Sequence, residues 1–138
     1  MSSDLGNNRY KEPKETGRNI LIVEDDSIQS FVLKAMVIEI NYNVLGVAKT
    51  GKQAIRMAKK LKPDIILMDI TLEDEMDGIA AAIEIKRSSN AHLIYVTGNS
   101  EAHLLNKVSQ TQYVEYLEKP VYQELLKKAL DKCFSKKI

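Results

Sequence analysis

Short apolar runs alternate with longer amphipathic segments along the chain from about Asn19 onward. The runs have the length of strands, and the segments between them have the spacing of helices, which indicates repeated strand–helix units around a parallel sheet. The predicted strands cover residues 20–24, 44–48, 65–69, 92–97 and 114–117. All but the second are dense in Ile, Leu and Val without strict alternation, as is typical of strands covered on both faces.

Short side chains that carry oxygen stand where the predicted helices begin, and such side chains accept hydrogen bonds from the free amides of a first turn. The predicted N-caps are Ser27, Thr50, Asp77 and Ser100. The last helix follows Pro120, and its expected buried stripe consists of Leu125, Leu126 and Leu130.

The first predicted helix, about residues 27–40, carries more apolar residues than one face requires. One face consists of Val32, Leu33, Met36 and Ile40, and a neighbouring face consists of Ile28, Phe31, Ala35 and Ile38. We expect one face to pack on the sheet. The other face either widens that core contact or forms a docking surface for a partner helix.

The composition favours one folded domain in a reduced, cytoplasmic setting. The chain has 138 residues, of which 44% are hydrophobic and 28% charged, with a net charge of +1, so neither disorder nor attraction to nucleic acid is indicated. The single Cys133 cannot form an internal disulfide, and no apolar run reaches the length of a membrane span. We expect residues 1–18 to form a flexible polar tail and residues 19–138 to form the domain, without direct contact to nucleic acid or membrane.

Three of the apolar runs end at, or are followed by, charged residues. These residues are Glu24-Asp25-Asp26, Asp69, and Lys119, which precedes Pro120. Because the carboxyl ends of parallel strands meet at one edge of the sheet, these groups are expected to lie close together there. Adjacent carboxylates repel one another unless a cation lies among them, and hard oxygen ligands suit Mg²⁺.

Each of these residues also has a purely structural interpretation. The acidic triplet is compatible with a capped and solvated start of a helix, and Asp69 with a turn residue after a strand. Lys119 alone is compatible with an ordinary surface lysine. Thr97, at the end of the fourth predicted strand, is compatible with an ordinary β-branched strand residue. Tyr116, in the fifth predicted strand, is compatible with a half-buried aromatic residue.

Taken together and in this order, these positions resemble the receiver domain of two-component response regulators. The resemblance covers about residues 19–134, and its strongest segments are Ile20-Leu21-Ile22-Val23-Glu24-Asp25-Asp26 and Tyr116-Leu117-Glu118-Lys119-Pro120. It implies a flavodoxin-like, doubly wound α/β fold with a five-stranded parallel sheet in the order 2-1-3-4-5 and helices on both faces. The loop of residues 71–78 departs from the family pattern, because it lacks the usual proline and reaches Asp77-Gly78 one residue late.

The resemblance also implies the ligands of a Mg²⁺ ion. Asp69 would be the phosphoacceptor, and Asp25 and Asp69 would bind the ion directly. Glu24 would act largely through water, and the main-chain carbonyl of Thr71 would complete the protein ligands.

The same resemblance implies roles for further residues and partners. Thr97 and Lys119 would hold the phosphoryl group, and Thr97 and Tyr116 would move together as a switch. The phosphodonor would be a histidine kinase or a histidine phosphotransfer protein. A downstream effector or a second copy of the chain would bind the face made by the fourth helix, fifth strand and fifth helix. The protein would catalyse its own phosphorylation and dephosphorylation and would not be an enzyme that acts on a separate substrate.

Two other functions compete with this one. An aspartate-dependent phosphohydrolase normally has a second acid two residues after the first in the first strand loop, but Asp25 is followed by Asp26-Ser27-Ile28. A degenerate receiver that acts only as a binding module would have an incomplete acidic pocket, whereas every expected member is present here.

Overall fold

Five parallel strands form one sheet with the order β2-β1-β3-β4-β5. The structure is a computed structural model, and it describes residues 18–72, 76–98 and 106–134. The strands are β1 (Asn19–Val23), β2 (Asn43–Ala48), β3 (Ile65–Asp69), β4 (His92–Thr97) and β5 (Glu115–Glu118). The predicted strand order is confirmed, and each predicted strand overlaps an observed one with ends that differ by one residue at most.

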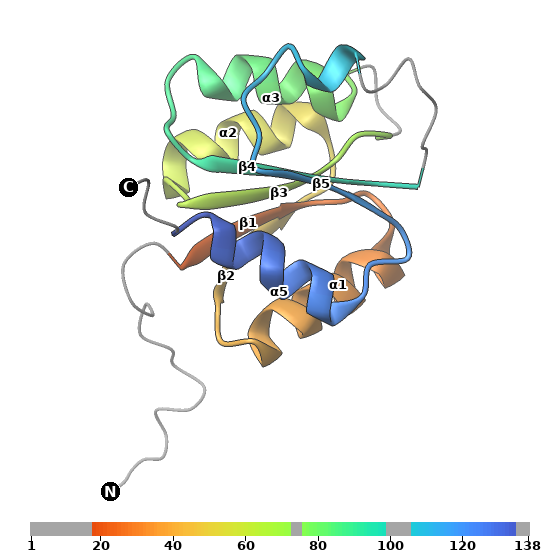
Figure 1. Cartoon of the computed structure of the whole chain (residues 1–138). Coiled ribbons are helices and arrows are strands. Elements are labelled where there is room, and N and C mark those ends of the chain that lie inside the picture. Colours follow the sequence, from red (N-terminus) through yellow and green to blue (C-terminus); the bar gives the residue numbers. More distant parts are fainter. Residues whose placement is uncertain (1–17, 73–75, 99–105, 135–138) are drawn as a thin grey trace, which may run out of the picture.

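Helices cover both faces of this sheet (Figure 1). The layer of α2 (Gly51–Leu61) and α3 (Gly78–Lys86) lies on one face, and the layer of α1 (Ser27–Glu39) and α5 (Gln123–Lys132) lies on the other. Helical residues 106–108, at the start of the last described range, precede β5. This is the predicted doubly wound, flavodoxin-like α/β architecture. No helix in the described ranges has the length and apolar character needed to cross a bilayer.

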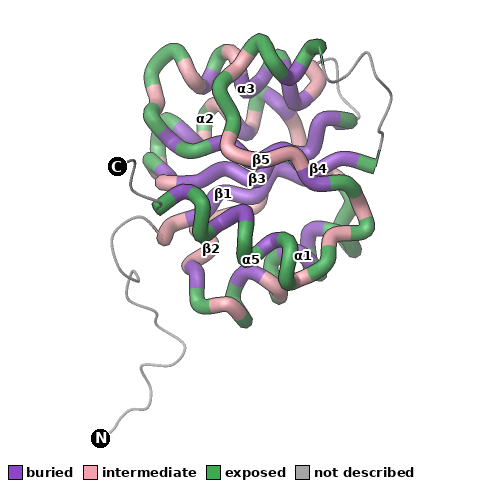
Figure 2. The backbone as a smooth tube through the Cα atoms, viewed as in Figure 1, coloured by how far each residue is buried: buried purple, intermediate pink, exposed green. Residues whose placement is uncertain are grey.

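Each face of the sheet carries its own hydrophobic core, because successive side chains of a strand point to opposite faces. Figure 2 shows that β1, β3 and β4 are buried along most of their length. In β1, Leu21 and Val23 pack with α2 and α3, whereas Ile20 and Ile22 pack with α1 and α5. All four are at most 1% exposed, and full burial of one such side chain contributes about 1.5–3 kcal/mol. The continuous apolar runs of the sequence therefore reflect burial on two sides.

The helix starts confirm two of the predicted caps and correct one. Thr50 accepts a hydrogen bond from the Gln53 amide at 3.0 Å, and Asp77 accepts one from the Ala80 amide at 2.8 Å. The prediction of Ser27 as the first cap is wrong, because Ser27 is already the first residue of α1 and the cap is Asp26, which accepts from the Gln29 amide at 2.9 Å. Ser100 lies outside the described residues.

Both helices of the α1–α5 layer expose apolar side chains that a core contact could have buried. The expected stripe of α5 is wrong at Leu125, which is 51% exposed, while Leu126 and Leu130 are buried as expected. In α1, Ile28 and Phe31 are 75% and 72% exposed, so their face does not widen the core contact. The alternative of a docking surface remains for this face.

Candidate functional site

The predicted site residues lie at the carboxyl edge of the sheet. Glu24 and Asp25 follow β1, Asp69 ends β3, and the two parallel strands pair so that Val23 lies beside Met68. Thr97 ends β4, and its carbonyl oxygen accepts a hydrogen bond from the Lys119 amide at 2.8 Å. The register of the sheet therefore brings together groups that are up to 95 residues apart in the chain.

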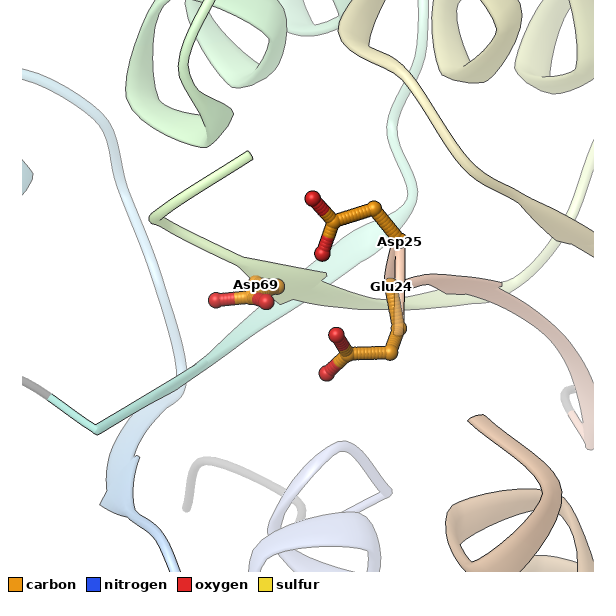
Figure 3. Close-up of side chains that lie close together, drawn as sticks. All are labelled: Glu24, Asp25 and Asp69. Carbon is orange, nitrogen blue, oxygen red and sulfur yellow. The ribbon is translucent and has the colours of Figure 1, made fainter. Parts of the chain in front are cut away.

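Three carboxylates face one another at this edge (Figure 3). Glu24, Asp25 and Asp69 each offer an oxygen, and these oxygens all lie within 4.8 Å of one another. Glu24 and Asp69 are only 2% and 4% exposed, and Asp25 is half-buried. Glu24 and Asp25 leave the end of β1 in different directions, and Asp69 lies beside them at the end of β3. The adjacent Asp26 does not share this cluster, since it is exposed and caps α1.

Lys119 supplies the positive charge of the cluster. Its Nζ donates to Glu24 Oε1 at 2.8 Å and to Asp69 Oδ2 at 3.2 Å. The second oxygen of Glu24 accepts the Asp26 amide at 3.0 Å, so the Glu24 carboxylate is held at both oxygens. Because both of its oxygens are held, Glu24 positions Lys119 beside Asp69, a contact that the sequence did not predict. The Lys119–Pro120 peptide bond is cis.

The electrostatics of the cluster show that one ammonium does not neutralise it. Burial, followed by the charge of Glu24, raises the pKa of Asp69 to about 7, although Lys119 acts in the opposite direction. Burial opposes the charge of Lys119, but its hydrogen bond to Glu24 and the charge of Asp69 raise its pKa above the ordinary value. At neutral pH the pocket therefore has capacity for a further cation, which would lower the repulsion between its carboxylates.

The remaining predicted residues lie around the cluster. The Thr71 amide donates to Asp69 Oδ1 at 3.1 Å, which turns the chain after β3 back toward that carboxylate. Thr97 is fully buried at the end of β4. Tyr116 lies farther back on β5, beside Tyr95 of β4, and packs against the core under α2 and α3.

A glycine that sequence reasoning left without a role fixes the loop after β3. The Gly78 amide donates to the Ile70 carbonyl at 2.8 Å, and a Cβ at Gly78 would lie 2.0 Å from the backbone oxygen of Asp69. Only glycine permits this approach of the α3 start to the Asp69 backbone. The Asp77-Gly78 pair, an N-cap followed by a residue without a Cβ, is the sequence signal that could have indicated it.

A groove of about 500 Å³ opens beside the cluster, between α1 and the chain that follows β5. Glu24 and Lys119 lie in its wall, together with Ile28 and Val32 of α1 and Val121 on the opposite side. The exposed apolar face of α1 therefore continues up to the charged site.

The donor set fits a small divalent cation, since three carboxylates offer hard oxygen ligands close to one another and a bound cation would favour the charged form of Asp69, whose pKa burial and Glu24 raise. A doubly wound α/β fold with an acidic pocket and a lysine at the carboxyl edge of its sheet defines a class of proteins that bind cations and phosphoryl groups at the switch point. The model of one family, the response regulator receiver domain, matches residues 20–131. The chain belongs to this family and is a receiver domain of a two-component system.

Several receiver proteins are similar along most of the chain. The chemotaxis protein CheY of Thermotoga maritima is 33% identical over 117 residues, which are 84% of this chain and 97% of that protein. The transcriptional regulatory protein YdfI of Bacillus subtilis is 37% identical over 114 residues, 81% of this chain but only 53% of YdfI. The chain thus spans nearly all of one relative and about half of the other.

Solved structures agree with this assignment. The receiver domain of sensor histidine kinase PA1611 from Pseudomonas aeruginosa superimposes with a TM-score of 0.75 at 32% identity, over 85% of this chain and 97% of that one. That domain holds a magnesium ion coordinated in its active site cleft. The acidic cluster described above is a potential metal site of the same kind.

Proposed function

We propose that Asp69 accepts a phosphoryl group from a phosphohistidine. An Asp69 carboxylate oxygen forms the new bond to phosphorus while the bond from phosphorus to the histidine nitrogen breaks, and the histidine leaves with the bonding electron pair. The observation that carries this proposal is the position of Lys119 Nζ, 3.2 Å from Asp69 Oδ2 within a cluster of three carboxylates. A fixed ammonium there offsets the charge that spreads over the phosphoryl oxygens.

The metal ligands proposed are Asp25, Asp69 and the Thr71 carbonyl, with Glu24 acting through water. A bound Mg²⁺ would supply positive charge that lowers the repulsion between the carboxylates and the incoming phosphoryl group. The raised pKa of Asp69 supports this proposal, because after burial its second cause is the charge of Glu24, which is part of this repulsion. The magnesium ion held by the similar PA1611 receiver supports the choice of metal.

The switch is proposed to involve Thr97 and Tyr116. Thr97 would bind the new phosphoryl group together with Lys119, and Tyr116 would follow Thr97 inward, which would change the face made by the fourth helix of the fold, β5 and α5. The half-buried position of Tyr116 beside β4 supports this idea, since a small displacement changes its exposure. A downstream effector or a second copy of the chain would bind that face.

The phosphodonor is proposed to be a histidine kinase or a histidine phosphotransfer protein that covers the start of the exposed face of α1, where Ile28 and Val32 line the groove. These two side chains are 75% and 47% exposed, and the wall of the groove also contains Glu24 and Lys119. Lys119 contacts Asp69, so a partner seated on this part of α1 would lie next to the proposed phosphoacceptor. A helix with an apolar face would bury these side chains and hold its histidine over the charged edge.

The extent and location of the domain follow from the same proposal. Residues 19–138 would form the receiver and residues 1–18 a tail, and the family match over residues 20–131 supports the receiver part of this proposal. Residues 1–17 lie outside the described part of the chain. The site would act in the cytoplasm, where ATP is available to form the phosphohistidine.

The test is an intact-mass measurement after incubation with acetyl phosphate, with Mg²⁺ or with a chelator. We expect the gain of one phosphoryl group only with Mg²⁺, and no gain in Asp69→Asn. Asp26→Asn is the matched control, because Asp26 lies next to the cluster but caps α1, and asparagine caps equally well. Undiminished labelling of Asp69→Asn would contradict the assignment. Repeated turnover of varied phosphomonoesters would favour a phosphohydrolase instead.

A further inference from the structure

Helix α2 exposes a face that consists only of cations. Its members are Lys52, Arg56, Lys59 and Lys60, which are all exposed. Arg56 is four residues from Lys52, three from Lys59 and four from Lys60, so the four share one side of the helix, along about 12 Å for eight steps of 1.5 Å. Helix α2 contains no acidic residue, and no ion pair within the described residues involves any of the four.

The cationic face as a whole is not explained by stabilisation of its own helix. Lys52 and Arg56, and again Arg56 and Lys60, are like charges four residues apart, and such pairs destabilise a helix. The helix dipole favours Lys59 and Lys60 in the last turn but disfavours Lys52 in the first. In α5, by contrast, Lys127 pairs with Asp131 at 2.9 Å. An anionic partner would offset the repulsion on α2.

A second observation lies at the C-terminal end of the same helix. A cavity of about 590 Å³ opens there, with Ile55 and Ala58 of α2 and Ile85 of α3 in its wall. Lys59 belongs both to this wall and to the cationic face, so the two features are continuous. The wall also contains Asp64 and Glu84, but Asp64 accepts the Asn19 amide and Glu84 pairs with Arg87 at 3.6 Å.

We propose that the cationic face of α2 and this cavity bind an acidic segment of a partner protein that places an apolar side chain in the cavity. Among the described residues, the exposed large hydrophobic side chains lie on α1, around β5 and α5 and at Phe134, which lines the cavity, and none of them is on α2. The face therefore lacks the apolar and aromatic contacts that a membrane surface or stacked bases would use. Carboxylates at helical spacing match its four cations, and the cavity provides an anchor.

The site is separate from the phosphorylation site. Its cavity is lined by residues such as Pro63, Asp64 and His92, at the starts of β3 and β4, whereas Asp69 and Thr97 mark the ends of those strands. The proposal therefore does not depend on the phosphoacceptor role of Asp69, and Asp69→Asn should bind the acidic segment as the unchanged protein does.

The test uses a fluorescent synthetic helical peptide with glutamates along one face and leucines beside them, and it measures fluorescence anisotropy at low salt. Arg56→Glu combined with Lys60→Glu should weaken binding about tenfold or more. The control is Lys34→Glu combined with Lys128→Glu, which changes the net charge equally on exposed positions of α1 and α5 and should bind like the unchanged protein. Equal weakening in both double variants would overturn the proposal.

Two more measurements complete the test. Ser88→Trp, at an exposed residue of the cavity wall, should fill the cavity and weaken peptide binding, whereas unchanged binding would contradict the apolar anchor. The same anisotropy assay with single-stranded oligo-dT, and sedimentation with vesicles of phosphatidylcholine and phosphatidylserine, examine other anions. Tighter binding of either through Arg56 and Lys60 would overturn the choice of an acidic protein segment.

Discussion

At the scale of single residues, Asp69 is a carboxyl group in surroundings that disfavour its charge. Its pKa is raised to about 7 by burial and by Glu24, so the folded protein holds a proton that the unfolded chain has already released. Protonated Asp69 therefore contributes to the free energy of unfolding of the folded protein. This contribution is fully present below the ordinary pKa of 3.8 and is lost as the pH rises through 7. A cation bound beside Asp69 would replace this proton.

We therefore predict that Asp69→Asn removes a pH dependence of stability. In the presence of a chelator, the free energy of unfolding of the unchanged protein should fall between pH 5 and about 8 relative to that of Asp69→Asn, because only the unchanged protein loses the proton. Urea denaturation at several pH values measures both proteins. Parallel curves would show that Asp69 does not titrate in this range.

The residue scale is also where the sequence was least informative. The identities of Glu24, Asp69 and Lys119 were predicted because each follows an apolar run, but their pairing was not. Glu24 Oε1 lies closer to Lys119 than Asp69 Oδ2 does, at 2.8 Å against 3.2 Å, and this depends on side-chain conformations that the spacing of residues does not specify. Asp26 and Ser27 are both competent caps, and the helix begins at Ser27 with Asp26 in the extended conformation of a cap.

At the scale of elements, the loop from β3 to α3 positions Asp69 through a backbone contact. We predict that Gly78→Ala lowers the free energy of unfolding by about 1–3 kcal/mol, because the new Cβ would lie 2.0 Å from the Asp69 oxygen and would displace the backbone. Gly98→Ala is the control, since the nearest atom to its Cβ would be Lys119 Cδ at 3.9 Å. Urea denaturation compares the two, and equal stability would contradict the described loop.

The exposed face of α1 leads to a prediction about phosphotransfer. Ile28→Ser should slow transfer from a phosphohistidine donor about tenfold, because Ile28 lines the groove, and should leave labelling by acetyl phosphate unchanged. Ile38→Ser is the control, since Ile38 lies ten residues farther along α1, about 15 Å away, and does not line the groove. Equal transfer rates in the two variants would place the docking surface elsewhere.

Elements were predicted well where burial on two faces produced uninterrupted apolar runs, as in β3 and β4, whose bounds agree with the prediction. Prediction was poorer where a helix is only partly covered. Leu125 fits a buried stripe by composition, yet the packing of α5 on the sheet buries Leu126, Ala129 and Leu130 and leaves Leu125 at the surface. The angle at which a helix meets a sheet is a tertiary property.

At the scale of the whole molecule, the two ends of the described chain meet at one aromatic contact. The Arg18 guanidinium lies 4.8 Å from the centre of the Tyr42 ring and 5.4 Å from that of Phe134, and the Tyr42 hydroxyl donates to Asp131 Oδ1 at 3.2 Å. This contact links the start of β1 with the end of α5, away from the carboxyl edge that carries Asp69.

We predict that Arg18→Ala lowers the free energy of unfolding by about 1 kcal/mol through loss of this cation–π contact, without a change in labelling by acetyl phosphate. Arg87→Ala is the control, because the ion pair of Arg87 among the described residues is an exposed one with Glu84, and its loss should cost less than about 0.5 kcal/mol. Thermal melting measures the change in stability, and an intact-mass measurement reports labelling by acetyl phosphate. A loss of labelling in Arg18→Ala would mean that the two edges of the sheet are coupled.

The central claim is that Glu24, Asp25, Asp69 and Lys119 form one pocket for a cation and a phosphoryl group. A crystal structure of the protein with Mg²⁺ and beryllofluoride tests it most directly. We predict beryllium bonded to an Asp69 oxygen, Lys119 in contact with a fluoride, and the metal between Asp25 and Asp69. Density for these groups elsewhere, or a cluster that stays empty under saturating Mg²⁺ and beryllofluoride, would contradict the account.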